Sequence, residues 1–149
     1  MIELVRTTPK NQDFIHLAKE LDTYLKITDG DDHDFYNQYN GLENIKHCVV
    51  AYKEGKAIGC GAIKPFDEYS IEIKRMYLKP AYRGQGTAER IISDLEAWAR
   101  EMNFARTILE TGDRQVEAVK FYHKMGYHLI FNYGQYADIK NSNCYEKKL

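Results

Sequence analysis

Hydrophobic and polar positions follow two different periods along the chain, and these periods predict its secondary structure. Apolar side chains recur at helical spacing over 14–25, 86–102 and 117–125, and the second segment is the clearest helix. Short apolar runs predict strands at 2–5, 70–78, 105–111, 127–131 and 143–149, and a hairpin over 47–63. The polar segment 28–41 is expected to be a loop, with room for one short helix that ends at Gly41. This order predicts a single α/β domain over 1–149, with a mixed sheet flanked by helices.

Composition narrows the possible classes of protein. The chain has 149 residues, is 44% hydrophobic and carries 21 basic against 22 acidic residues, so no global basic field points to nucleic acid. The beginning of the chain lacks the pattern of a signal peptide, and no apolar run is long enough to cross a membrane. Its cysteines are odd in number and far apart, which fits buried reduced thiols better than a disulfide framework. We therefore expect a cytoplasmic protein with no membrane partner.

Metal binding is not predicted. The five histidines form none of the usual zinc-ligand spacings. The stretch DGDDHD resembles the start of a calcium loop, but Asp34 stands where such a loop requires glycine and Asn40 where it requires glutamate.

The stretch MYLKPAYRGQGTAERII combines a strand, a glycine turn and a helix. A helix N-terminus offers unpaired N–H groups and the positive end of its dipole, and glycine lets the backbone approach a phosphate closely. The dinucleotide fingerprint fails because Glu89 stands where a third small residue belongs, and a P-loop fails because Thr87 and Ala88 follow Gly86. The pattern that fits is R-x-x-G-x-A from Arg83 to Ala88. The alternative is a tight connection surrounded by solvated basic side chains.

The strand before this turn changes parity. Ile71 and Ile73 point to one face, whereas Met76 and Leu78 have the opposite parity, so a regular strand cannot bury both pairs on one side. A β-bulge near 74–75 would restore the match, and the alternative is a strand buried on both faces. A bulged, splayed strand exposes backbone groups to an extended ligand that contains amides. Coenzyme A has both an amide-containing pantetheine arm and a pyrophosphate.

With these features, the chain resembles the GNAT superfamily of acyl-CoA-dependent N-acyltransferases. EIKRMYLKPAYRGQGTAERII is similar to the family's central strand, pyrophosphate loop and following helix. ILETGDRQVEAVKFYHKMGY is similar to its fifth strand and fourth helix, and the tail resembles small bacterial members. The resemblance implies the GNAT fold, with a central, mostly antiparallel sheet splayed at the fourth strand.

The resemblance also implies a set of site residues. The backbone of the turn would hold the pyrophosphate, and the neighbouring strand and a side chain before the fourth helix would hold the pantetheine arm. These cofactor-binding residues are Met76, Tyr77, Leu78, Arg83, Gly84, Gln85, Gly86, Thr87, Ala88, Gln115 and Tyr122. Gln115 departs from the family pattern, where many members have asparagine. Tyr122 stands at the position of a general acid and Glu72 at that of a general base.

The chemistry supports these assignments. An amine must lose a proton before it attacks a thioester, the oxyanion needs a donor such as a strand N–H near Met76, and the leaving thiolate needs a proton. Tyr122 could instead be a core aromatic residue and Glu72 a solvent-facing one; Glu110 or a chain of waters is the competing base. We expect direct transfer of acetyl from acetyl-CoA to a primary amine through a tetrahedral intermediate, without a metal.

The acceptor and the assembly are less defined by the sequence. The acidic and aromatic loop after the first helix would favour a small cationic amine, unless it is merely solvated, and a peptide amine is also compatible. Tyr133 and Tyr136 would line the opposite wall. A monomer and a homodimer fit the sequence equally well. The rival interpretation is a non-catalytic acyl-CoA-binding sensor or regulatory module.

Overall fold

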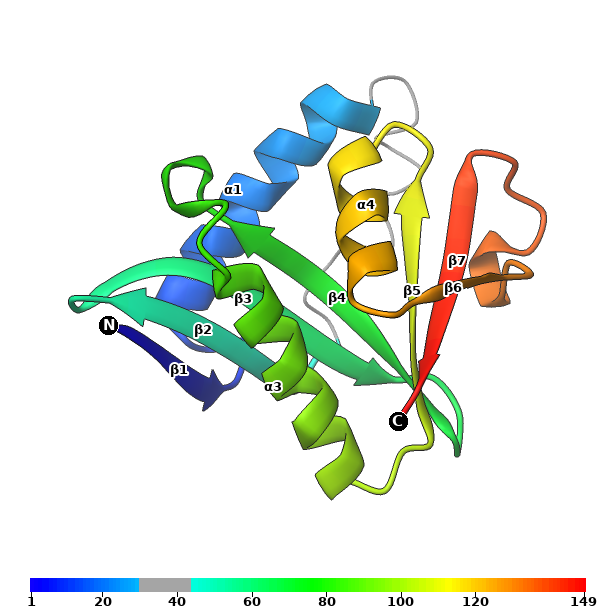
Figure 1. Cartoon of the computed structure of the whole chain (residues 1–149), viewed down its shortest axis with the longest axis horizontal. Coiled ribbons are helices and arrows are strands. Elements are labelled where there is room, and N and C mark those ends of the chain that lie inside the picture. The colour runs from blue at the N-terminus through cyan, green and yellow to red at the C-terminus, as the bar shows by residue number, and fades with distance from the viewer. Residues whose placement is uncertain (30–43) are drawn as a thin grey trace.

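The computed structural model describes residues 1–29 and 44–149, which form one sheet with helices on both faces (Figure 1). The helices are α1 (Gln12–Asp29), α3 (Thr87–Glu101) and α4 (Val116–Lys124), with short 3-10 turns η2 (Pro80–Tyr82) and η3 (Gly134–Tyr136). The strands are β1 (Ile2–Thr7), β2 (His47–Lys53), β3 (Lys56–Pro65), β4 (Ser70–Leu78), β5 (Arg106–Gly112), β6 (His128–Ile130) and β7 (Ser142–Lys148). Their order in the sheet is β1-β2-β3-β4-β5-β7-β6. The segment 30–43, which holds most of the expected acidic loop, lies outside the described residues.

Local sequence signals explain how several elements begin and end. The side chain of Asn11 accepts a hydrogen bond of 3.0 Å from the Phe14 N–H, and it therefore caps α1. Glu54 and Gly55 have φ angles of 52° and 79°, which form the tight two-residue turn between β2 and β3. Gly126, with φ of 92°, follows α4 and ends it. The expected hairpin and the helices around 14–25, 86–102 and 117–125 are thus confirmed.

A β-bulge interrupts β4 at Arg75. Tyr77 is opposite Cys60 and Lys74 is opposite Ala62, so two residues of β4 face the single residue Gly61 of β3. Arg75 has φ of 58°, a conformation that is costly for a residue with a side chain. The bulge brings Ile71, Ile73, Met76 and Leu78 into the same hydrophobic cluster, as the parity change in the sequence predicts.

Hydrogen bonds that Arg75 donates to α1 hold the bulge in place. The Arg75 Nη2 donates to the Ala18 carbonyl at 2.6 Å and to the Asp22 carboxylate at 2.9 Å. The Arg75 side chain is 2% exposed, and its Nε and Nη1 have no hydrogen-bond partner within the described chain. These contacts offset part of the strain in the backbone.

Strands β4 and β5 are the one parallel pair among the described strands, and they separate after a few residues. Their pairing covers only Ser70↔Arg106, Ile71↔Thr107 and Glu72↔Ile108. Beyond Glu72 the strands diverge, and α4 lies across the opening (Figure 1). The mostly antiparallel sheet, splayed at its fourth strand and flanked by helices, confirms the expected fold class.

The two faces of the sheet have separate cores. On one face, Phe14 and Leu17 of α1 pack against side chains of β2 and β3. On the other, Ile91, Ile92 and Leu95 of α3 pack against the odd-numbered isoleucines of β4. Residues of α4 join this second core, and Figure 1 shows α3 and α4 on the side of the sheet opposite α1. Because side chains alternate along a strand, Glu72 and Lys74 point to the α1 side.

Other sequence expectations have mixed outcomes. The three cysteines are free and buried, as expected. Strand β6 is shorter than the predicted 127–131, because Tyr127 turns into the core to bond with Thr107 while Phe131 is exposed. No helix within 1–29 and 44–149 is long and apolar enough to cross a membrane.

Candidate active site

Two adjoining cavities occupy the opening between β4 and β5. One, of about 290 Å³, runs beside the glycine turn and the start of α3, and we call it the donor groove. The other, of about 110 Å³, lies between β4, β5 and the β6–β7 connection, and we call it the acceptor cavity. The side chains that line both are Leu21, Met76, Gln115, Ala118 and Tyr122. The two spaces therefore meet where the sheet is open.

The glycine turn gives the donor groove an uncapped helix N-terminus. Gly84 and Gly86 have φ angles of 80° and 83°, which glycine adopts readily. Gly86 is the N-cap of α3, and no side chain caps its free N–H groups. Both glycines, Thr87 and Ala88 line the groove, whereas the Gln85 side chain lies outside it, 3.5 Å from the Lys53 Nζ. The turn thus presents backbone N–H groups and the positive end of the α3 dipole.

The edge of β4 forms another wall of the donor groove. The Lys79 N–H donates to the Ile58 carbonyl of β3 at 2.9 Å. Because backbone groups of alternate residues point to opposite edges, those of Met76 and Leu78 turn toward the opening. The Leu78 carbonyl already accepts a 2.9 Å hydrogen bond from the Arg83 Nε. This bond holds the Arg83 guanidinium at the groove, where it also lies over the rings of Tyr24 and Tyr77.

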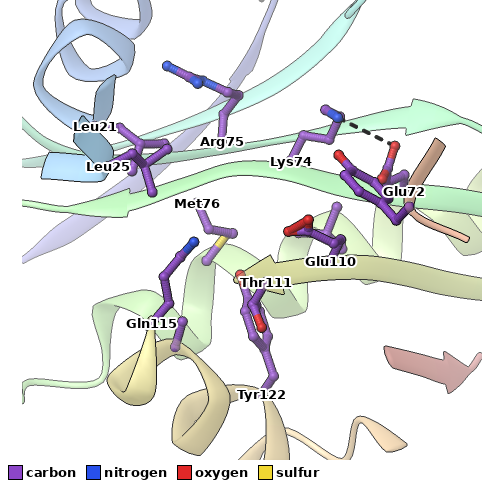
Figure 2. Close-up of a pocket in the computed structure, with 13 residues that line it drawn as sticks. Leu21, Leu25, Glu72, Lys74, Arg75, Met76, Glu110, Thr111, Gln115 and Tyr122 are labelled. Atoms are coloured by element: carbon purple, nitrogen blue, oxygen red, sulfur yellow. Dashed lines mark ion pairs between the residues drawn. The ribbon is translucent and has the colours of Figure 1, made fainter. Parts of the chain in front are cut away.

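Tyr122 lies where the two cavities meet, and Thr111 lies in the wall of the acceptor cavity (Figure 2). The Tyr122 ring packs edge-on against Phe121 and Tyr127, and burial raises the pKa of its hydroxyl well above the usual range. Thr111 is 3% exposed, and its Oγ1 has no hydrogen-bond partner within the described chain. A buried hydroxyl without a partner is unfavourable in the free protein. This hydroxyl belongs to a residue in the wall of the acceptor cavity, beside Glu110 on β5.

Glu72 is held on the α1 side of β4. The Tyr133 hydroxyl donates to its Oε2 at 2.7 Å, and the Lys74 Nζ lies 3.6 Å from its Oε1. Figure 2 shows Lys74 and Glu72 on one side of the strand and Met76 on the other. Burial and the negative charge of Glu72 raise the pKa of Tyr133. Tyr133 therefore remains a protonated donor at neutral pH.

Glu110 forms the opposing wall on β5. The Ser142 hydroxyl of β7 donates to its Oε2 at 3.1 Å. Tyr136 also lines the acceptor cavity, and its pKa is raised by burial and then by the charges of Glu110 and Glu72. The acceptor cavity is therefore lined by two carboxylate residues, one lysine, one arginine and buried phenols.

The structure brings most of the predicted site residues together. Gln115 precedes α4 and lines both cavities, and Tyr77 lines the donor groove while its hydroxyl points to Glu20 of α1. Sequence reasoning missed Lys74 and Thr111 as site residues. Lys74 lies two positions after Glu72, and Thr111 lies one position after Glu110. Their closeness along the strands to these candidate bases was the signal that could have found them. Of the described residues, no group of three or more metal-binding side chains gathers in space.

Comparisons with known proteins identify the family. The profile of the Acetyltransferase (GNAT) family matches residues 11–127. An IAA acetyltransferase of Azospirillum brasilense is 29% identical over 99% of this chain and 98% of its own length. A solved protein of Klebsiella pneumoniae, assigned as an acyl-CoA N-acyltransferase, is 29% identical, with a TM-score of 0.84 over 100% of this chain and 98% of its own. A GNAT acetyltransferase of Elizabethkingia anophelis, solved with acetyl-CoA bound, shares the fold at 17% identity with a TM-score of 0.74 over 99% and 98% of the two chains.

The splayed sheet, the glycine turn and these matches define one class of protein. The chain belongs to the GNAT acetyltransferase family. It is an acyl-CoA N-acyltransferase, and the family resemblance deduced from the sequence is confirmed.

Proposed function

We propose that the protein transfers an acetyl group from acetyl-CoA to a primary amine by direct attack, with no covalent enzyme intermediate. The observation that carries this proposal is the meeting of the donor groove and the acceptor cavity at Met76, Gln115 and Tyr122. A thioester placed at this junction is open to the donor groove on one side and to an amine on the other. Direct transfer requires such two-sided access.

The donor groove suits coenzyme A. The uncapped N-terminus of α3 and the two glycines would receive the pyrophosphate, and Arg83 adds a positive charge beside it. The Met76 and Leu78 backbone would pair with pantetheine along the β4 edge, which has no strand partner in the described chain beyond Glu72. The thioester of acetyl-CoA supplies the activated acetyl carbon. Its carbonyl would accept a hydrogen bond from the Met76 N–H.

The amine must be deprotonated on the acceptor side. Glu72 accepts a hydrogen bond from Tyr133 and faces the Lys74 ammonium, so its charge is already compensated. Glu110 lies on the opposing wall of the cavity, on β5, and its Oε2 accepts a hydrogen bond from the Ser142 hydroxyl. We therefore assign to Glu110, directly or through water, the proton of the attacking amine. Glu72 then serves to position Lys74 and Tyr133.

Tyr122 stabilises the leaving group. In the transfer, a bond forms between the amine nitrogen and the acetyl carbon, and the bond from that carbon to sulfur breaks. The electron pair goes to sulfur, beside the Tyr122 hydroxyl. Because burial raises the pKa of Tyr122, its hydroxyl stays protonated, and hydrogen-bond donation to the thiolate is favoured over complete proton loss. The proton taken from the amine finally neutralises the thiolate.

Two measurements test this function. Calorimetry should show acetyl-CoA binding at one site per chain, and this binding should weaken as salt concentration rises because of the phosphates. Thiol release should then depend on added amine, with mass spectrometry detecting the N-acetyl product. Acetyl-CoA binding without release across a broad amine panel would instead indicate the non-catalytic sensor. Absence of binding would exclude both functions.

A further inference from the structure

Lys74 and Glu110 occupy equivalent positions on the two sides of the opening. Glu72 pairs with Ile108 as the last partners of the parallel ladder, and paired residues point to the same face. Two residues further along each strand stand Lys74 and Glu110. They therefore share the α1 face and would oppose each other if the ladder continued. Because the ladder ends, a cavity lies between them instead (Figure 2).

From this arrangement we infer that the acceptor is a zwitterion of the α-amino acid type. Its carboxylate pairs with the Lys74 ammonium, and its amino group lies at Glu110. This inference rests on the proposed function and names the substrate class of that site. The sequence alone predicts a small cationic amine instead, and the experiment below compares the two classes.

The surroundings of Lys74 favour an anionic ligand. Its side chain is 8% exposed, and its ion pair with Glu72 has an N–O distance of 3.6 Å. This distance is too long for a good hydrogen bond, so the ammonium retains donors that can reach a ligand. A mostly buried ammonium is costly unless it is well paired, and a carboxylate in the cavity would complete its coordination.

Of the charged groups around the cavity, Lys74 is the one best placed to pair with a carboxylate. Arg75 also lines the cavity, but its side chain is 2% exposed and its Nη2 donates to the Ala18 carbonyl and the Asp22 carboxylate of α1. The phenols of Tyr133 and Tyr136 come from the β6–β7 connection and are neutral at ordinary pH. Only Glu72 and Glu110 add negative charge among the described lining residues.

This charge pattern discriminates between acceptors. A diamine would place a second ammonium near Lys74, and two like charges at close range repel. A monoamine with no carboxylate would leave Lys74 with only its long ion pair to Glu72. An amino acid can pair its carboxylate with Lys74 and its amino group with Glu110 at the same time. It should therefore be the preferred class of acceptor.

The decisive experiment compares matched acceptors. Each L-α-amino acid is assayed for thiol release beside the amine that lacks only its carboxylate and beside its carboxamide. For the best amino acid we expect kcat/KM to exceed that of both analogues by about tenfold or more, a typical size for one charge-assisted contact. An equal or higher kcat/KM for the decarboxylated amines would overturn the inference while leaving acetyl transfer intact. If none of the acceptors supported thiol release, the proposed function itself would be refuted, and this inference with it.

Variants of Lys74 locate the recognition. Lys74→Met should lower kcat/KM for the amino acid by about tenfold or more, chiefly through KM, and should leave the decarboxylated amine unchanged or improved. Lys74→Arg keeps the charge and should retain the preference for the amino acid. An unchanged acetyl-CoA Kd in both variants shows that the fold is intact. Equal losses for amino acid and amine in Lys74→Met would contradict a role in carboxylate recognition.

Discussion

Tyr133 donates a 2.7 Å hydrogen bond to Glu72, a lining residue of the acceptor cavity, and so ties the β6–β7 connection to strand β4. Tyr133→Phe should remove this bond without changing the shape of the ring. We expect KM for the acceptor to rise several-fold, because Glu72 and Lys74 lose a fixed partner, while the acetyl-CoA Kd stays the same. Steady-state kinetics measure the acceptor KM, and calorimetry measures the acetyl-CoA Kd. A weaker acetyl-CoA affinity with normal acceptor KM would contradict this assignment.

Tyr122→Phe should reduce kcat by about tenfold to a hundredfold, since one hydrogen bond to a developing charge is lost. The acetyl-CoA Kd should change by less than about twofold, because the ring still fills its place.

Tyr127 provides the matched control for Tyr122. It is an equally buried tyrosine with its ring centre 5.7 Å from that of Tyr122, but its hydroxyl points to Glu96 and Thr107 rather than into the cavities. Tyr127→Phe should lower thermal stability and leave kcat unchanged. If both variants lost kcat equally, Tyr122 would be a packing residue.

Gly86→Ala should weaken acetyl-CoA binding. The left-handed conformation at φ of 83° costs a residue with a side chain about 1 kcal/mol, so the turn should relax away from its ligand-binding shape. We expect the Kd to rise about fivefold to tenfold. Gly55→Ala, at φ of 79° in the β2–β3 hairpin, should cost similar stability yet preserve the Kd. Calorimetry beside thermal unfolding separates these effects.

Thr111→Val should stabilise the free protein by about 1 kcal/mol, because it replaces a buried hydroxyl without a partner by a methyl group of similar size. If the hydroxyl contacts a ligand in the acceptor cavity, the same change should raise KM for the acceptor amine and leave the acetyl-CoA Kd unchanged. Urea unfolding measures the stability, and steady-state kinetics with calorimetry measure KM and Kd. Lower stability in the free variant would show that the hydroxyl has a partner in solution.

Stability should fall under alkaline conditions. Burial raises the pKa of the Cys48 thiol to about 12 and that of Cys144 to about 11, and it raises those of Tyr122 and Tyr127 as well. Because the folded pKa exceeds the unfolded value, stability is complete below about pH 9 and declines above it. Each such group contributes about 1.4 kcal/mol per pH unit until its folded pKa is reached.

Urea unfolding between about pH 8 and 11 checks this slope. Cys48→Ala removes one of the titrating groups and should make the decline shallower by one proton. A slope that does not differ between Cys48→Ala and the parent would show that this thiol titrates normally in the folded protein.

The sequence was most informative where one physical requirement acts on consecutive residues. The parity change between Ile73 and Met76 predicted the bulge, and the spacing of Gly84 and Gly86 predicted the turn. The sequence was least informative about which residues of β4 and β5 face each other across the opening. The relation of Lys74 to Glu110 depends on where the parallel ladder ends, and no local pattern encodes that point. The sequence likewise could not predict that the Thr111 hydroxyl lacks a hydrogen-bond partner, because this depends on how the side chains pack.

The alternation of side chains along β4 and β5 has a further consequence. Before the bulge, the even-numbered residues Glu72 and Lys74 line the acceptor cavity, whereas after it the even-numbered Met76 and Leu78 join the core under α3 and line the donor groove. Under the proposed function, a substitution at Lys74 should therefore change which amine is accepted while leaving in place the glycine turn and the β4 edge that would bind acetyl-CoA. Donor binding and acceptor choice would then depend on different residues of one strand.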